Sequence, residues 1–201
     1  MSLREGFGLV TLEALAAGAP VVVSQIEPFT GYLDERVCCW AQPDDAVHSF
    51  VNDIEEGVGT YLYGRRMYEV MRYWETAPTG NGQAPFLADY ATIWQAADKI
   101  VYSTSLADAQ TARTTLERRF DPEAVRTRKD AADRDLSVGG PGLAEQALRE
   151  GIVDEVRRFV VPVIVGGGTA FLPDHLRLGL ELLDERRFPN GTVYLAYRVV
   201  T

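Results

Sequence analysis

The chain has 201 residues, of which 46% are hydrophobic and 24% are charged, so it is long enough and apolar enough to bury a sizeable core. This composition excludes a disordered tail, a collagen-like fibre and a coiled coil. The 29 acidic residues outnumber the 20 basic ones, and the net charge of −9 argues against nucleic acid or anionic lipid as a partner.

The sequence carries no pattern for a metal site or a membrane span. The two cysteines, Cys38 and Cys39, are adjacent and are expected to be small buried hydrophobic residues. With only two histidines besides, no zinc site can be assembled. The longest apolar region, 12–23, is interrupted by Glu13, Gly18 and Pro20 and is shorter than the roughly 20 residues of a spanning helix. We therefore expect a cytoplasmic protein without a metal.

Helical and strand-like patterns alternate along the chain. The patterns predict helices over 7–17, 44–56, 66–73, 86–96, 115–132 and 143–150. They predict strands over 21–23, 60–63, 99–103, 136–138, 153–165, 178–188 and 192–200.

The order of these elements predicts the fold class. Alternating strands and helices indicate a parallel sheet with helices on both faces. The sequence Pro189-Asn190-Gly191 between the last two strands is typical of a hairpin turn. We expect a three-layer α-β-α fold whose mixed sheet is mostly parallel and ends in a C-terminal antiparallel hairpin. Residues 20–201 are predicted to form this domain, and residues 1–19 a head segment that need not belong to it.

Three glycine-rich turns follow predicted strands, at residues 64–66, 139–142 and 166–168. Glycine allows a ligand to approach the backbone, and free N–H groups at a helix start attract phosphate. Arg65 and Arg66 add guanidinium donors beside the first turn. A single turn of this kind is usually no more than helix-entry geometry, but three in one domain indicate a dinucleotide-like ligand. The Gly-x-Gly-x-x-Gly and P-loop patterns are both absent.

These turns lie in longer stretches that resemble one family. The stretches are YLYGRRMYE at 61–69 with Tyr73-Trp74 after it, SVGGPGL at 137–143, GIVDEV at 151–156 and PVIVGGG at 162–168. Their order and spacing resemble the dihydrofolate-reductase-like superfamily. Within it, they are most similar to the C-terminal reductase domain of the bifunctional riboflavin-biosynthesis deaminase-reductases.

The resemblance implies a homodimeric, NADPH-dependent oxidoreductase. The implied reaction is hydride transfer to a heterocyclic, ribosylamino-pyrimidine or pterin-like small molecule, as in 5-amino-6-(5-phosphoribosylamino)uracil reductase or dihydrofolate reductase. By the same resemblance, Gly64, Arg65 and Arg66 face the adenosine-side phosphates, and Ser103 and Thr104 lie near the adenine ribose. The implied residues at the pyrophosphate are Gly139, Gly140 and Gly142, and those on the nicotinamide side are Gly166 and Gly167.

Two departures from the family pattern concern the substrate. Thr30 stands where the family has a substrate-binding Asp, and Val138 stands where riboflavin-pathway members have an acidic residue. A neutral pocket for a flat ring could instead be built by Thr30, Trp40, Tyr73 and Trp74. The alternative is that these aromatic residues are ordinary packing. The missing acids also leave open a catalytically silent nucleotide-binding module.

The head of the chain resembles a second family. Residues 4–22 are similar to the donor-site motif of retaining glycosyltransferases, in which glutamates at the positions of Glu5 and Glu13 bind a sugar nucleotide. This match covers about a tenth of the chain, so a sugar-nucleotide-binding protein is the less favoured alternative.

Overall fold

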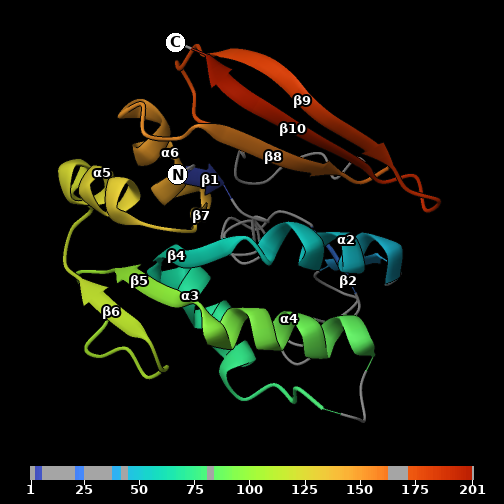
Figure 1. The fold of residues 1–201 in the computed structure, drawn as a ribbon, viewed down its shortest axis with the longest axis horizontal. Helices are drawn as coiled ribbons and strands as arrows, with labels where there is room; N and C mark the ends of the chain where they lie inside the picture. The colour runs from blue at the N-terminus through green and yellow to red at the C-terminus, as the bar shows by residue number, and fades with distance from the viewer. Residues whose placement is uncertain are drawn as a thin grey trace.

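The computed structural model describes residues 3–5, 21–24, 38–41, 45–80, 84–162 and 172–200, with side chains described from residue 45 onward. Among them, eight strands form one sheet in the order β6-β5-β4-β7-β1-β8-β10-β9 (Figure 1). The strands are β1 (Leu3–Glu5), β4 (Val58–Gly64), β5 (Asp98–Tyr102), β6 (Thr114–Glu117), β7 (Asp135–Gly139), β8 (Glu155–Val160), β9 (Gly179–Arg187) and β10 (Val193–Val200).

The sheet is mixed. All neighbours from β6 to β8 pair in parallel, whereas β10 is antiparallel to both β8 and β9. The turn between β9 and β10 is closed by hydrogen bonds from Phe188 N to Thr192 O (2.8 Å) and from Thr192 N to Asn190 Oδ1 (2.9 Å). The predicted C-terminal hairpin is therefore confirmed.

Prolines begin three of the helices. Pro85, Pro122 and Pro141 each occupy the first turn of their helix, where the missing N–H costs no hydrogen bond. Asp121 caps the second of these helices by accepting from the backbone N–H groups of Glu123 and Ala124. The helices are α2 (Asp45–Glu55), α3 (Arg65–Met71), α4 (Pro85–Ala96), α5 (Pro122–Ala131) and α6 (Pro141–Arg149), with a 3₁₀ turn, η2 (Arg72–Glu75), after α3.

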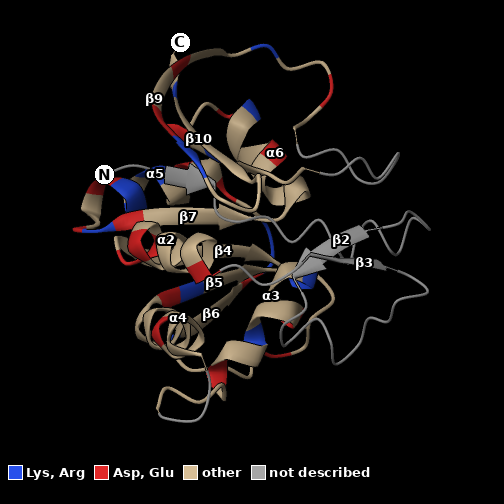
Figure 2. Cartoon of the chain, turned by 90° about the vertical axis from the view of Figure 1, so that its right-hand side faces the viewer, with Lys and Arg blue, Asp and Glu red and all other residues tan. Residues whose placement is uncertain are grey.

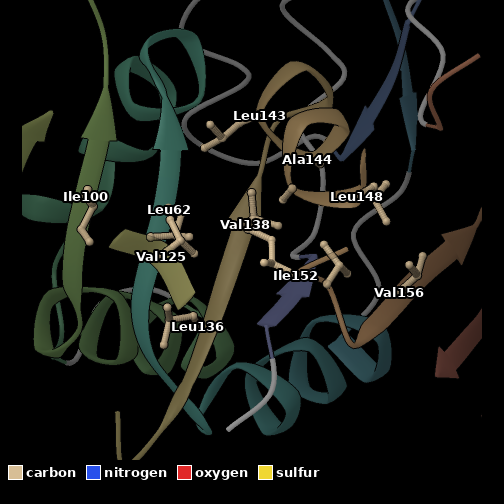
Figure 3. Packing of buried hydrophobic residues seen from close by; sticks show 12 residues of the cluster. Leu62, Ile100, Val125, Leu136, Val138, Leu143, Ala144, Leu148, Ile152 and Val156 are labelled. Carbon is tan, nitrogen blue, oxygen red and sulfur yellow. The ribbon is translucent and has the colours of Figure 1, made fainter. Parts of the chain in front are cut away.

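Alternate side chains of β4 enter two different cores. Leu62 points into a cluster with Leu136, Val138 and the apolar residues of α5 and α6 (Figure 3). Tyr61 and Tyr63 belong to the opposite cluster, with residues of α3 and α4. Because helices cover both faces, the parallel strands are buried on both sides. The predicted three-layer fold is confirmed.

The helix α2 covers the C-terminal strands on the same side as α4. Phe50 contacts the rings of Phe159, Phe188 and Tyr194, with ring centroids 6.2, 5.5 and 4.8 Å away. Asn52 of α2 donates from Nδ2 to the carbonyl oxygen of Phe86 in α4 (2.7 Å). These contacts join the hairpin to the helical layer.

One predicted helix is wrong in its first part. Thr114–Glu117 forms β6, the edge strand beside β5, and the helix α5 begins only at Pro122. The two adjacent threonines favour a strand. Asp121 and Pro122 are a typical N-cap and first helical residue, so a new helix begins there and does not continue from residue 115. Residues 117–119, between the threonines and Asp121, are charged like the helix that follows, so the sequence pattern does not show where the strand ends and the helix begins.

The N-terminal third differs from the expected order. The backbone of Leu3–Glu5 pairs in parallel with β7 and β8 in the middle of the main sheet. The predicted strand at 21–23 is present as β2 (Val21–Ser24), but it pairs with β3 (Cys38–Ala41) in a separate two-stranded sheet. The predicted helix over 7–17 lies outside the described residues. The domain boundary between residues 19 and 20 stays a prediction.

Candidate functional site

A cleft of about 450 Å³ opens at the carboxyl ends of β4, β5, β6 and β7. The direction of strand addition reverses there, because β5 and β6 follow on one side of β4 and β7 lies on its other side. Open α/β sheets bind their ligands in crevices at such a switch point. The lining residues are Gly64, Arg65, Arg66, Met67, Tyr102, Ser103, Thr104, Ser105, Arg118, Arg119, Phe120, Gly140, Gly142, Leu143 and Gln146.

Two glycines of the cleft make no contact within the described residues that requires glycine. A methyl group built on Gly64 would meet no atom within 4 Å, and its φ of −72° suits any residue. Gly142, in the first turn of α6, likewise has open space where a side chain would stand. Within the described residues, neither packing nor backbone strain requires glycine at these positions, and the absent side chains leave the backbone open to close approach.

The other two glycines of this region shape the turn itself. Gly140 has a φ of +95°, which side chains rarely adopt. A methyl group on Gly139 would lie 3.1 Å from Met67 Cε and 3.4 Å from the Tyr63 ring. Gly139 is the only predicted glycine among the described ones that does not line the cleft, and its role is close packing of β7 against β4 and α3.

Four arginines line the cleft, although the chain as a whole is acidic. Arg65 forms an exposed ion pair with Glu69 (3.6 Å) on the same helix, and such a pair is weak. Arg119 is exposed and has no hydrogen bond or ion pair within the described part of the chain. Elsewhere acidic and basic residues are interspersed over the described elements (Figure 2). The cleft is thus locally positive, which favours an anion, and a phosphate oxygen matches guanidinium donors.

Helix α6 adds to this preference. Its first turn carries Gly142 and Leu143, and the positive end of a helix dipole favours a negative ligand.

Aromatic rings line the side of the cleft near β5 and β6. Tyr102 and Phe120 pack edge to face, with ring centroids 5.3 Å apart. Burial raises the pKa of Tyr102 to about 12, so its phenol stays neutral at physiological pH. These rings offer a neutral apolar surface to a flat group.

The described residues that line the cleft include no carboxylate, histidine or cysteine. They offer positive charge, hydroxyls, an amide and aromatic surface, which bind and orient a ligand but supply no acid–base pair.

The structure brings together seven residues that the sequence predicted. They are Gly64, Arg65, Arg66, Ser103, Thr104, Gly140 and Gly142. Ser103 is 8% exposed, and its Oγ accepts hydrogen bonds from the backbone N–H groups of Ser105 (3.3 Å) and Leu106 (2.9 Å). Thr104 and Ser105 are exposed beside it, so they present hydroxyls to the cleft.

Of the residues predicted for a substrate pocket, the two described side chains, Tyr73 and Trp74, do not line this cleft. Trp74 is 7% exposed and packs edge to face against Tyr73 and Tyr90, with centroids 5.2 and 4.7 Å away. Packing thus accounts for Trp74. Thr30, Gly166 and Gly167, and the side chain of Trp40, lie outside the described residues.

Sequence reasoning missed the contribution of the segment after β6. Arg118, Arg119 and Phe120 line the cleft, but a continuous helix over 115–132 would have left them on a solvated face. The signal that could have found them is the pair of adjacent threonines before two arginines, which is typical of a strand that ends in a charged loop.

A second group of titratable residues lies between the sheet and the helices α3 and α4, outside the cleft. Burial raises the pKa values of Tyr61, Tyr63 and Tyr90 well above the usual 10.0. Lys99 is 1% exposed; its Nζ donates to Trp94 O (3.2 Å) and lies 4.1 Å from the Trp94 ring centroid, and burial lowers its pKa. Hydrogen bonding and ring contact account for this buried cation.

Within the described residues, no helix is long and apolar enough to cross a membrane. No cluster of three or more His, Cys, Asp or Glu residues in the same part of the chain could hold a metal ion.

The fold and the cleft define an α/β protein with an open cleft at the carboxyl ends of its parallel strands. Comparison with known proteins identifies the family: residues 34–194 match the RibD C-terminal domain, and the chain belongs to this family. Residues 1–59 also match the family of glycosyl transferases group 1.

The chain is similar to one curated protein in sequence and to several solved structures in fold. The uncharacterized protein YyaP of Bacillus subtilis is 24% identical over 160 residues, which are 79% of this chain and 81% of that protein. The structure of a putative riboflavin biosynthesis protein from Shewanella has a TM-score of 0.61 at 14% identity, over 91% of this chain and 99% of that one. Dihydrofolate reductase from Enterococcus faecalis, solved with NADP(H), has a TM-score of 0.52 at 14% identity, over 92% and 98% of the two chains. The predicted resemblance to the RibD and dihydrofolate-reductase-like proteins is confirmed.

Proposed function

We propose that this protein is an NADPH-dependent reductase of the riboflavin-biosynthesis type, which transfers a hydride to a heterocyclic or ribosylamino-pyrimidine small molecule. The observation that carries the proposal is the pair Gly64 and Gly142. Both line the cleft, and neither is required by packing or by backbone strain. A dinucleotide whose pyrophosphate lies against the starts of α3 and α6 would use this space.

The remaining residues of the cleft fit the same ligand. Arg65, Arg66 and Arg119 supply positive charge for its phosphates, and Thr104 and Ser105 supply hydroxyls for its ribose. Tyr102 and Phe120 offer apolar surface to its adenine ring. When bound, the nicotinamide supplies the hydride, and the protein binds and orients it. Gly166 and Gly167, outside the described residues, are carried over as the nicotinamide side.

The substrate differs from that of typical riboflavin-pathway members in one respect. Val138 is completely buried beside Leu62 and Leu143, so this position supplies no carboxylate to a substrate. Thr30 stands at the other position where the family has an acid. We therefore propose a substrate that carries less positive charge, or fewer hydrogen-bond donors, in the part that the family's two acids would contact. The alternative is a catalytically silent module of the same fold that binds the nucleotide without turning it over, and the same two substitutions favour it.

Calorimetric titration with NADPH tests binding, and the decrease in absorbance of NADPH with pyrimidine and pterin substrates tests turnover. Saturable binding together with oxidation supports the reductase. Binding without oxidation of NADPH by any of these substrates favours the silent module. Absence of binding at millimolar NADPH refutes both.

The proposed reductase acts in the cytoplasm as a homodimer. The edge strand β9 supports the homodimer. Leu180, Leu182 and Leu183 of β9 are 46%, 50% and 38% exposed, and β9 has a free edge in the described sheet. A free strand edge is a template for pairing with another chain, and the three leucines add apolar surface to an otherwise charged strand. We call these three leucines the β9 surface and propose that a second copy of the chain covers it.

A further inference from the structure

The loop that follows β5 forms one wall of the cleft and is held by several hydrogen bonds. Its first residue, Ser103, donates its backbone N–H to Glu117 O (2.9 Å), which extends the pairing of β5 with β6. Its Oγ accepts from Ser105 N and Leu106 N, at 3.3 and 2.9 Å. The chain therefore turns sharply at 103–106, with Thr104 and Ser105 on its exposed side.

Arg118 binds the same loop from the end of β6. Its Nη1 donates to the carbonyl oxygens of Ser103 (3.3 Å) and Leu106 (2.6 Å). Its Nη2 lies 3.5 Å from the carbonyl oxygen of Ala107. One planar guanidinium thus spans three carbonyls of a single loop, a geometry that the compact ammonium of lysine does not reproduce.

We propose that Arg118 is a positioning residue for the cleft. By binding the carbonyls of residues 103, 106 and 107, it holds this loop in the conformation that presents Thr104 and Ser105 to the ligand. This inference rests on the proposed nucleotide-binding function, and it assigns to Arg118 a role distinct from that of its neighbour.

The contrast with Arg119 separates positioning from charge. Both arginines are exposed and line the cleft, but Arg119 makes no hydrogen bond or ion pair within the described residues, whereas Arg118 donates to the loop. The guanidinium of Arg119 is available to a phosphate, and that of Arg118 is occupied by backbone carbonyls. Preorganised groups bind more tightly because the free energy of ordering is not lost on binding.

The test compares Arg118→Lys and Arg118→Met with the wild type. Lysine keeps the positive charge and loses the planar fork, and methionine loses both. We expect NADPH to bind roughly tenfold or more weakly to each variant, since ordering a few backbone residues on binding is costly. Arg149→Met is the matched control, because Arg149 also donates to a backbone carbonyl, that of Asp174 (2.7 Å), away from the cleft. The control should bind NADPH as the wild type does.

A second readout is independent of the cofactor. Amide hydrogen exchange of residues 103–107 in the ligand-free protein should become faster in Arg118→Lys and Arg118→Met, with exchange in α6 and β7 unchanged. Wild-type exchange in this loop in both variants would overturn the inference. NADPH binding by Arg118→Lys at wild-type affinity would also overturn it, because charge alone would then suffice. If the wild type binds no NADPH, the proposed function fails, and the exchange measurement still decides whether Arg118 holds the loop.

Discussion

The two edges of the main sheet use their residues in opposite ways. At one edge, β6, β5, β4 and β7 are parallel and covered by helices on both faces, so that Leu62 and Val101 are completely buried. At the other edge, every residue of β9 is exposed, including the three leucines of the β9 surface.

The difference shows where each half of the sheet can meet another molecule. In the parallel half, side chains along the strands are used in the core, and only the carboxyl ends and the loops after them remain for a ligand. The glycines and arginines of the cleft lie at these ends. In the antiparallel half the strand itself is accessible, and its apolar side chains suit a protein surface rather than a phosphate. The following predictions test this division.

The largest effect is expected at the glycines of the cleft. Gly64→Ala and Gly142→Ala should each weaken NADPH binding by about ten- to hundredfold, because the added methyl group occupies the space of the ligand. Gly142→Ala should raise the free energy of unfolding by about 0.5–1 kcal/mol, since alanine favours the helix. Titration calorimetry and urea unfolding measure the two quantities.

The matched control for these variants is Gly151→Ala. Gly151 has a φ of +64° and lies after α6, outside the cleft residues. Alanine there should destabilise the fold by about 1 kcal/mol and leave NADPH binding unchanged. Unchanged NADPH affinity in both cleft variants would show that their open space does not receive the cofactor.

A smaller effect on affinity is expected at the basic side of the cleft. Replacement of Arg65 and Arg66 by alanine should weaken NADPH binding by about tenfold and NADH binding less, because guanidinium groups bind the additional phosphate of NADPH. Competition titrations with the two cofactors measure the ratio. Equal losses for both cofactors would remove these arginines from phosphate recognition.

At the opposite edge, Leu182→Lys should convert a dimer into a monomer without weakening NADPH binding. Leu182 is 50% exposed on β9, and a charge on an edge strand opposes pairing with another chain. Ala131→Lys adds the same charge at the exposed end of α5 and should leave the oligomeric state unchanged. Sedimentation velocity distinguishes the outcomes, and a wild type that sediments as a monomer would refute the proposed homodimer.

A last effect, on stability and not on binding, appears only at alkaline pH. Burial raises the pKa values of Tyr61, Tyr63 and Tyr90 above 10.0, so above pH 10 the unfolded chain loses protons that the folded protein keeps. Stability should therefore fall as the pH rises beyond 10. Tyr61→Phe should reduce this slope by about 1.4 kcal/mol per pH unit in urea unfolding. An unchanged slope would mean that Tyr61 ionises equally in both states.

Local patterns predicted much of the fold and one side of the cleft. The run from Tyr61 to Arg66 and the turn at 139–142 carry their glycines and arginines in adjacent positions, so the sequence indicates both the strand end and the binding groups. The contribution of Arg118 and Arg119 could not be predicted in the same way. It depends on β6 pairing with β5, a long-range contact that the charged composition of 115–132 conceals.

The place of the head was equally beyond local patterns. Three residues, Leu3–Glu5, carry too little periodicity to indicate a strand, and their position follows from pairing with β7 and β8. Trp74 was ambiguous for a different reason. The sequence pair Tyr73-Trp74 fits a ring-binding pocket as well as internal packing, and only the contacts of Trp74 with Tyr73 and Tyr90 show that it packs.

The central claim is that the cleft between the starts of α3 and α6 receives the pyrophosphate of NADPH. A crystal structure of the complex with NADPH tests it most directly. We predict density for the pyrophosphate against Gly64 and Gly142, with the adenosine end toward Ser105 and Arg119. Density for NADPH elsewhere on the protein, with this cleft empty, would contradict the account.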